Sequence, residues 1–203
     1  MSGCGKAWWP ARAWVSGPAS GWVLAIVPAG IFVGLLTFVG RPSTGFELDW
    51  VPVLGLKLSL LVDGLSLTFG LAVSGIGAFV LVYSGAYLKR HPHRGRFMAF
   101  MLLFTGSMLG LVFADSLVAL FAFWELTAVT SYLLIGFDQE REAARRAAFQ
   151  ALVVTTIGGL SLMAGGVLLR VLSGTWTISA LGDSPGLINA VWSYPWVVGF
   201  IIV

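Results

Sequence analysis

The chain has 203 residues, of which 58% are hydrophobic, and only 12 Lys or Arg and 9 Asp or Glu residues carry charge. An ordinary soluble domain carries roughly 25% charged residues, and a mean hydropathy of +0.91 leaves too little polar surface to cover a water-soluble core. The composition therefore excludes a soluble globular enzyme and indicates a membrane protein with several spans. The net charge of +3 comes from short basic clusters, which do not favour nucleic-acid binding.

The predicted elements begin with an N-terminal segment, residues 1–20, whose single cysteine, Cys4, cannot form an intramolecular disulfide. The rest of the chain, 21–203, is predicted to be one transmembrane helical domain of an all-α integral membrane protein. A spanning helix needs roughly 20 apolar residues. Runs nearly free of charge predict about six helices, at about 21–40, 62–88, 97–114, 117–137, 147–171 and 187–203. The last of these runs is cut off by the end of the chain.

The basic residues predict an orientation in the membrane. When the loops alternate across six spans, nine basic residues fall on one side and three on the other. The nine are Lys6, Arg12, Lys89, Arg90, Arg94, Arg96, Arg141, Arg145 and Arg146; the three are Arg41, Lys57 and Arg170. Cytoplasmic loops carry the excess of Lys and Arg. The N-terminus is therefore predicted to be cytoplasmic, in a multi-pass protein of the inner (plasma) membrane.

One acid stands in the middle of a predicted span. Glu125 is surrounded by the apolar and aromatic residues of FAFWELTAVTSYLLIGF, 121–137. An ionised carboxylate at mid-depth costs at least about 2.5 kcal/mol, so it needs a paired cation, a water-filled cavity or protonation. Burial raises the pKa of a carboxyl group and an approaching cation lowers it again. Glu125 is therefore the candidate proton-translocating residue, and the alternative is a structural glutamate bonded to neighbouring helices.

Polar residues near Glu125 are candidates for the lining of a channel. They are Thr127, Thr130, Ser131, Tyr132, Thr155 and Thr156. Any one of these hydroxyls is as readily explained by a bond to its own helix backbone. Asp63 lies at the start of one predicted helix and Asp115 precedes another, so each is interpreted as an N-cap. A role for them where a cation enters the membrane is the competing interpretation.

The sequence predicts neither a metal site nor a cofactor. His91 and His93 stand in KRHPHRGR, where the basic neighbours and Pro92 disfavour a bound cation. There is no phosphate-binding loop, no nucleophile–base pair and no cysteine or histidine cluster for haem or iron–sulfur. We interpret the histidine-containing loop as a cytoplasmic anchor.

Four stretches resemble one family of membrane proteins. They are VDGLSLTF (62–69), RFMAFMLLFTGSMLGLVFADSL (96–117), FWELTAVTSYLLIGF (123–137) and LVVTTIGGLSLMAGGVLL (152–169). They resemble the antiporter-like proton-channel subunits, which comprise the A subunit of Mrp-type sodium/proton antiporters and the large membrane subunit of respiratory complex I. The resemblance spans roughly 55–170.

Two details favour the Mrp branch. Leu126 and Thr127 follow the glutamate, where the complex I branch is expected to carry Gly. Thr156, Gly158 and Gly159 stand where the complex I protein usually carries Arg, Gly and Asp. The resemblance implies a secondary-transporter subunit rather than an enzyme, with sodium and protons as the transported ions and other membrane subunits as partners.

The resemblance also implies what lies beyond the chain. Glu125 matches the family's essential glutamate, which pairs with a lysine in a motif resembling TKSAQFPF; the chain stops at GFIIV, where that motif would follow. We therefore expect an N-terminal piece of a longer subunit. Two alternatives stay open. One is a proton-pumping subunit of an NADH-quinone oxidoreductase, and the other is a truncated scaffold paralogue that transports nothing.

Overall fold

The computed structural model describes residues 20–51, 56–89, 91, 93–182 and 193. Its elements follow in chain order. They are α2 (Ser20–Leu36), β1 (Thr44–Val51), β2 (Leu56–Val62), α3 (Gly64–Tyr87), α4 (Arg94–Phe113), α5 (Leu117–Ile135), α6 (Glu142–Ser173) and α7 (Ile178–Gly182).

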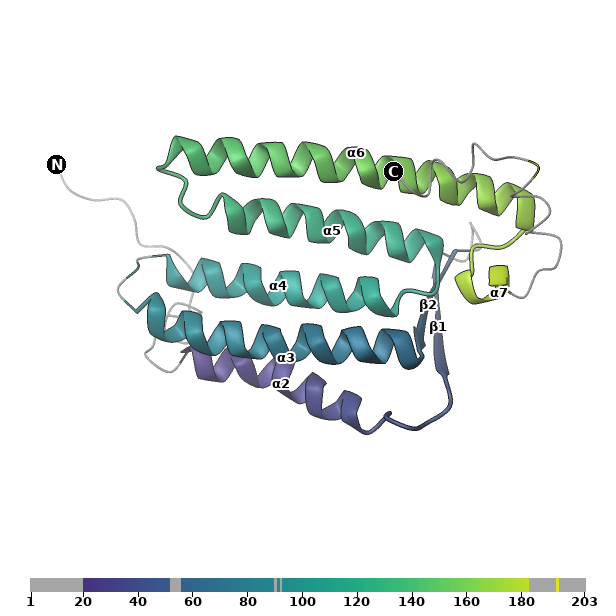
Figure 1. Ribbon diagram of the computed structural model, residues 1–203, viewed down its shortest axis with the longest axis horizontal. Helices are drawn as coiled ribbons and strands as arrows, with labels where there is room; N and C mark the ends of the chain where they lie inside the picture. Colours follow the sequence, from purple (N-terminus) through teal and green to yellow (C-terminus); the bar gives the residue numbers. More distant parts are fainter. Residues whose placement is uncertain (1–19, 52–55, 90, 92, 183–192, 194–203) are drawn as a thin grey trace.

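The long helices α3, α4, α5 and α6 lie side by side in chain order, and α2 packs against α3 (Figure 1). Within the described residues, four helices are long and apolar enough to cross a membrane: Gly64–Tyr87, Arg94–Phe113, Leu117–Ile135 and Glu142–Val171. Gly21–Leu36 is a shorter apolar helix. The prediction of an all-α integral membrane protein with about six helices is confirmed as a mainly helical membrane fold. Four candidate spans and a shorter apolar helix are described, and the predicted helix at 187–203 lies outside the described residues.

Small residues bring α2 and α3 into close contact. A Cβ added to Gly21 would lie 2.6 Å from the Cα of Gly85, so the two backbones approach too closely for any side chain. Close approach through small residues is how helices associate in lipid, where burial of apolar surface gives no advantage over the acyl chains. Ala25, Leu81 and Met98 form the buried core where α2, α3 and α4 meet.

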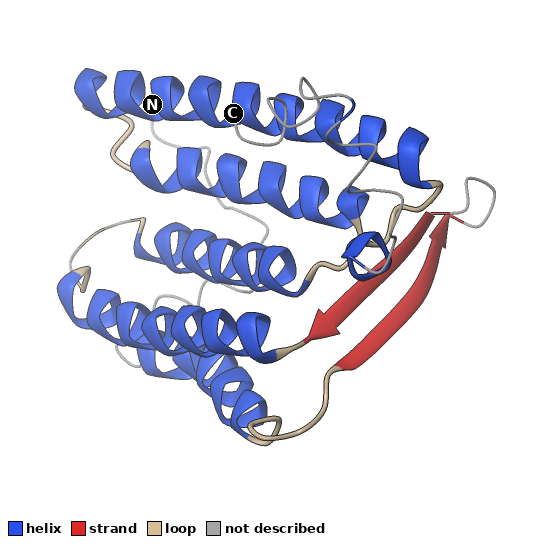
Figure 2. Ribbon diagram, turned by 45° about the vertical axis from the view of Figure 1, so that its right-hand side comes forward, coloured by secondary structure: helices blue, strands red, loops and turns tan. Residues whose placement is uncertain are grey.

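A β-hairpin, which the sequence patterns did not predict, runs across one end of the helices (Figure 2). β1 and β2 pair antiparallel, from Thr44 opposite Val62 to Val51 opposite Leu56. The amide of Asp115 then donates to the carbonyl oxygen of Ser59 at 2.9 Å, which ties the hairpin to the α4–α5 connection. The helix predicted to begin at 62 therefore begins only after β2 has ended.

The other helix ends differ by a few residues. α2 ends at Leu36, before the predicted end at 40. α6 begins at Glu142, five residues before the predicted start at 147, because DQEREAARR contains good helix formers. Glu142 also accepts a hydrogen bond from Arg146 one turn later, at 2.6 Å. α6 ends at Ser173, and its C-cap residue Gly174 has a φ of +79°, the left-handed conformation that favours glycine.

Candidate functional site

Glu125 lies at the contact between α5 and α6. It is half-buried, and its Oε1 atom is fully buried and accepts no hydrogen bond from the residues that the structure describes. Oε1 lies against the backbone of the buried Gly159 in α6, so closely that a Cβ on Gly159 would collide with it. The carboxylate predicted to lie in the middle of a span therefore faces a neighbouring helix.

Trp124 fixes α5 against α6 at this level. Its indole Nε1 donates to the carbonyl oxygen of Thr155 at 3.3 Å. In a regular helix that same carbonyl accepts from the N–H of Gly159, four residues later. A Cβ on Gly159 would also lie 2.9 Å from Trp124 Cδ1. Trp124, Glu125 and Gly159 thus form one packed unit across the two helices.

Three of the predicted channel-lining hydroxyls donate to their own helix. Thr127 Oγ1 donates to the carbonyl of Trp124 at 2.7 Å, Thr130 Oγ1 to that of Leu126 at 2.8 Å, and Thr155 Oγ1 to that of Ala151 at 2.8 Å. A hydroxyl carries a single proton to donate. In this arrangement none of the three hydroxyls donates to Glu125. Towards water or an ion pathway, each can act only as a hydrogen-bond acceptor.

The other three predicted channel-lining residues, Ser131, Tyr132 and Thr156, have no described hydrogen bond to Trp124, Glu125 or Gly159. Ser131 and Thr156 are half-buried. Tyr132 lines a cavity of about 300 Å³ where α5 ends and α6 begins, together with residues that include Gly136, Gln139 and Arg145. Tyr132 is seven residues after Glu125, which is about 10 Å along a helix. A channel-lining role for these residues stays a prediction.

Asp63 is the N-cap residue of α3. Its carboxylate accepts the backbone N–H of Ser66 at 2.7 Å, while the Ser66 hydroxyl accepts the backbone N–H of Asp63 at 2.8 Å. This reciprocal pair is a capping box, and it satisfies two of the orphan donors at a helix start. The pKa of Asp63 is lowered below 3.8, first by the backbone hydrogen bond from Ser66 and then by the Ser66 side chain.

The prediction that Asp115 caps the helix carrying Glu125 is wrong. The N-cap of α5 is Ser116, whose side chain makes no capping hydrogen bond. Asp115 instead accepts the backbone N–H of Ser179 at 2.8 Å with Oδ1 and the Ser179 hydroxyl at 2.8 Å with Oδ2. It therefore caps α7, because the chain returns past the start of α5 after α6 and brings a second helix start within reach.

The described residues contain no group of three or more His, Cys, Asp or Glu that could hold a metal ion. The rings of His91 and His93 lie 6.0 Å apart, and His91 packs on Phe137 at 5.1 Å between ring centroids. The loop that carries them thus packs against the α5–α6 connection. Gly159 was not predicted as a site residue, because only the rotation of α6 shows which of its residues face Glu125. Trp124 was not predicted either, because its hydrogen bond to Thr155 joins residues 31 positions apart in the sequence.

Comparison with known proteins gives two family matches. Residues 50–98 match a family described as "NADH-Ubiquinone oxidoreductase (complex I), chain 5 N-terminus", and residues 114–203 match one described as "NADH:quinone oxidoreductase/Mrp antiporter, TM". The chain is also 41% identical over 182 residues to the A1 subunit of the Na(+)/H(+) antiporter of Staphylococcus aureus, a match that covers 84% of this chain and 23% of that relative.

Solved structures agree with these matches. A chain of the Mrp complex from Dietzia sp. DQ12-45-1b superposes with a TM-score of 0.80 and 36% identity, over 95% of this chain and 20% of that one. A chain of the membrane-bound sulfane sulfur reductase, an archaeal respiratory membrane complex, superposes with a TM-score of 0.72 and 15% identity, over 95% of this chain and 30% of that one. The second likeness shows a shared fold.

These matches show that the chain belongs to the NADH:quinone oxidoreductase/Mrp antiporter family of membrane subunits. Within that family it corresponds to the N-terminal region of the Mrp-type A subunit, and the resemblance inferred from the sequence motifs is confirmed. The chain spans about a quarter of the length of the curated relatives it matches, 23%.

Proposed function

We propose that this chain forms the N-terminal part of the A subunit of a multisubunit Na⁺/H⁺ antiporter, in which Glu125 takes up and releases the transported proton. The observation that carries the proposal is the buried Glu125 Oε1, which has no donor among the described residues. An ionisable group inside a membrane-spanning segment is most often part of an ion or proton pathway. The partners are other membrane subunits of the same complex.

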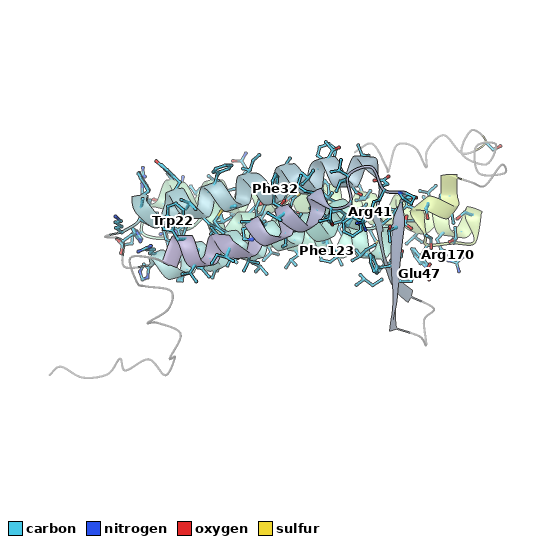
Figure 3. The ribbon with its side chains drawn as sticks, turned by 90° about the horizontal axis from the view of Figure 1, so that it is seen from below. Trp22, Phe32, Arg41, Glu47, Phe123 and Arg170 are labelled. Atoms are coloured by element: carbon cyan, nitrogen blue, oxygen red, sulfur yellow. The ribbon has the colours of Figure 1, made fainter. Side chains whose placement is uncertain are left out.

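The distribution of charge supports an orientation with the α3–α4 and α5–α6 connections in the cytoplasm. Arg41 and Arg170 lie at the hairpin end of the helices, as does Glu47, whereas Trp22 lies towards the opposite end (Figure 3). The more numerous basic residues of 89–96 and 138–146 belong to the opposite connections. From the positive-inside rule we infer that the hairpin lies outside and the N-terminus of the chain inside.

The test is Glu125→Gln in the full-length protein, incorporated with its partner subunits in vesicles. We expect loss of sodium-driven proton movement with assembly retained, because the amide has nearly the same shape and cannot carry the proton. Glu125→Asp should keep partial activity, since the carboxyl survives with a shorter reach. The matched control is Glu142→Gln, which removes an exposed acid at the start of α6 and should leave transport unchanged.

Normal transport by Glu125→Gln would overturn the proposal and leave Glu125 a structural residue. The same vesicles separate the second candidate, a proton-pumping subunit of an NADH-quinone oxidoreductase, which the complex I match at 50–98 favours. Proton movement that depends on sodium and needs no NADH supports the antiporter. Proton movement that needs NADH and ignores sodium supports the other candidate.

A further inference from the structure

Gly159 is the point of α6 that meets the carboxylate of Glu125. It is buried, and the space that a side chain would occupy is already taken by two groups of α5. One is Glu125 Oε1, with which a Cβ would collide, and the other is the Trp124 indole, whose Cδ1 and Nε1 would lie 2.9 and 3.1 Å from that Cβ. Real Cβ atoms essentially never approach within 3.0 Å of another heavy atom, so a side chain at 159 would force a group of α5 to move.

The two neighbours differ in how freely they can move. The indole is bonded through Nε1 to the carbonyl of Thr155, one turn before Gly159, so a shift of the ring breaks or weakens that bond. Glu125 Oε1 has no hydrogen bond within the described ranges to hold it, and it stands at the end of a flexible side chain. The carboxylate is therefore the group that a side chain at 159 displaces first.

We propose that Gly159 is a positioning residue for Glu125: the absence of a side chain there creates the place in which the carboxylate lies against α6. The inference rests on the proposed function, because it gives Gly159 a part in proton uptake at Glu125. It goes beyond that function in naming a residue of α6 that carries no charge and no hydrogen-bonding side chain, yet sets where the carboxylate stands.

The test compares Gly159→Ala with Gly166→Ala in the full-length protein of the assembled complex. Gly166 is buried on the same helix two turns later, but a Cβ there would meet Leu117 at ordinary contact distances of 3.8 and 3.9 Å. The first readout is the rate of sodium-driven proton movement. The second is the rate at which a hydrophobic carbodiimide modifies Glu125, followed by mass spectrometry across a pH series. That rate depends on the position and protonation of the carboxyl group, whether or not the group transports protons.

We expect Gly159→Ala to lower the transport rate at least about tenfold, because a displacement of a reacting group by about 1 Å can cost up to about 100-fold in rate. It should also change the rate at which the carbodiimide labels Glu125. Gly166→Ala should change neither. Equal behaviour of the two variants, or a labelling profile in Gly159→Ala that coincides with that of the unmodified protein, would overturn the proposal.

A second pair of variants separates positioning from general packing. Glu125→Asp withdraws the carboxylate from Gly159 by one methylene, so adding Gly159→Ala to it should have little further effect on labelling. If Gly159→Ala instead has the same effect in both backgrounds, the collision is with Trp124 and the proposal fails. If Gly159→Ala reduces assembly, the amount of assembled complex replaces labelling as the readout. Adding Glu125→Asp to Gly159→Ala should then restore the amount of assembled complex.

The two hypotheses can fail separately. Normal transport in Glu125→Gln overturns the proton-site function whatever Gly159 does. The labelling comparison still reports whether Gly159 sets the position of the carboxylate, because it requires only that Glu125 reacts.

Discussion

The contact between Asp115 and α7 offers a quantitative prediction. Asp115 is 9% exposed, and its two carboxylate oxygens each accept a hydrogen bond of 2.8 Å from Ser179. Hydrogen bonds to a charged group contribute about 1.5–3 kcal/mol each. Ser179 is exposed, so water replaces part of what its N–H and hydroxyl lose. We therefore expect less than the sum of two such bonds, and Asp115→Ala should reduce the local stability of α7 by about 2 kcal/mol in total, close to the contribution of one bond.

Hydrogen exchange followed by mass spectrometry measures this loss where it occurs. About 2 kcal/mol corresponds to a roughly 30-fold increase in the opening constant, so amides of 177–182 should exchange roughly 30-fold faster in Asp115→Ala. Asp115→Asn keeps an acceptor without the charge and should give a smaller increase. The backbone bond from the Ile178 amide to the Asp115 carbonyl, 2.8 Å, persists in both variants and limits the opening.

The location of the change decides between the two roles for Asp115. Faster exchange confined to 177–182 supports the contact with Ser179. Unchanged exchange there, with faster exchange at the start of α5, would refute the reasoning and restore the capping role that the sequence predicted for the helix carrying Glu125. Peptides from the middle of α3 serve as the internal reference, since no described hydrogen bond of the Asp115 side chain reaches them.

Two further predictions concern the start of α3 and the orientation of the chain in the membrane. Asp63→Ala should lower the free energy of unfolding by about 1 kcal/mol, because the capping bond to Ser66 is lost. The pKa of Asp63 is lower in the folded chain, so its stabilisation is complete above pH 3.8 and is lost as the pH falls through the folded pKa. In that pH range the unfolding temperature of Asp63→Asn should therefore depend less on pH than that of the unmodified protein. For orientation, cysteines introduced at Glu140 and Phe46, with Cys4 replaced by serine, should react with an impermeant maleimide from the cytoplasmic and the outer side respectively. Reaction of both from one side would contradict the topology.

The spanning helices could be predicted from the sequence because the charge-free runs are as long as a bilayer is thick. The hairpin could not be separated from them. Its second strand, LKLSLLV, alternates as a strand does, but it is rich in leucine and runs directly into the apolar start of α3. Prediction from length and hydropathy therefore assigned residue 62 to the helix. The boundary between β2 and α3 is seen only from the backbone pairing of β2 with β1.

The site was predictable in part for the same reason. A single carboxylate inside an apolar run identifies Glu125 without any knowledge of its neighbours. Contacts between elements distant in the sequence have no such signal. Asp115 and Ser179 are 64 residues apart, and Glu125 meets Gly159 only because of the way α6 is rotated against α5. When a long helix is apolar on all sides, its sequence has no polar–apolar periodicity that shows which face contacts the neighbouring helix.

The lack of a fixed donor to Glu125 Oε1 among the described residues is itself consistent with proton exchange. A buried acceptor left without a partner costs about 1–3 kcal/mol, and hydroxyls stand close to it in sequence at Thr127 and Thr130. Both of these donate to carbonyls of their own helix instead. A donor held permanently at the carboxylate would stabilise its charged form and hold the group in one protonation state. Glu125 Oε1 is instead placed by packing against Gly159, with no hydrogen bond from a described residue to fix its orientation.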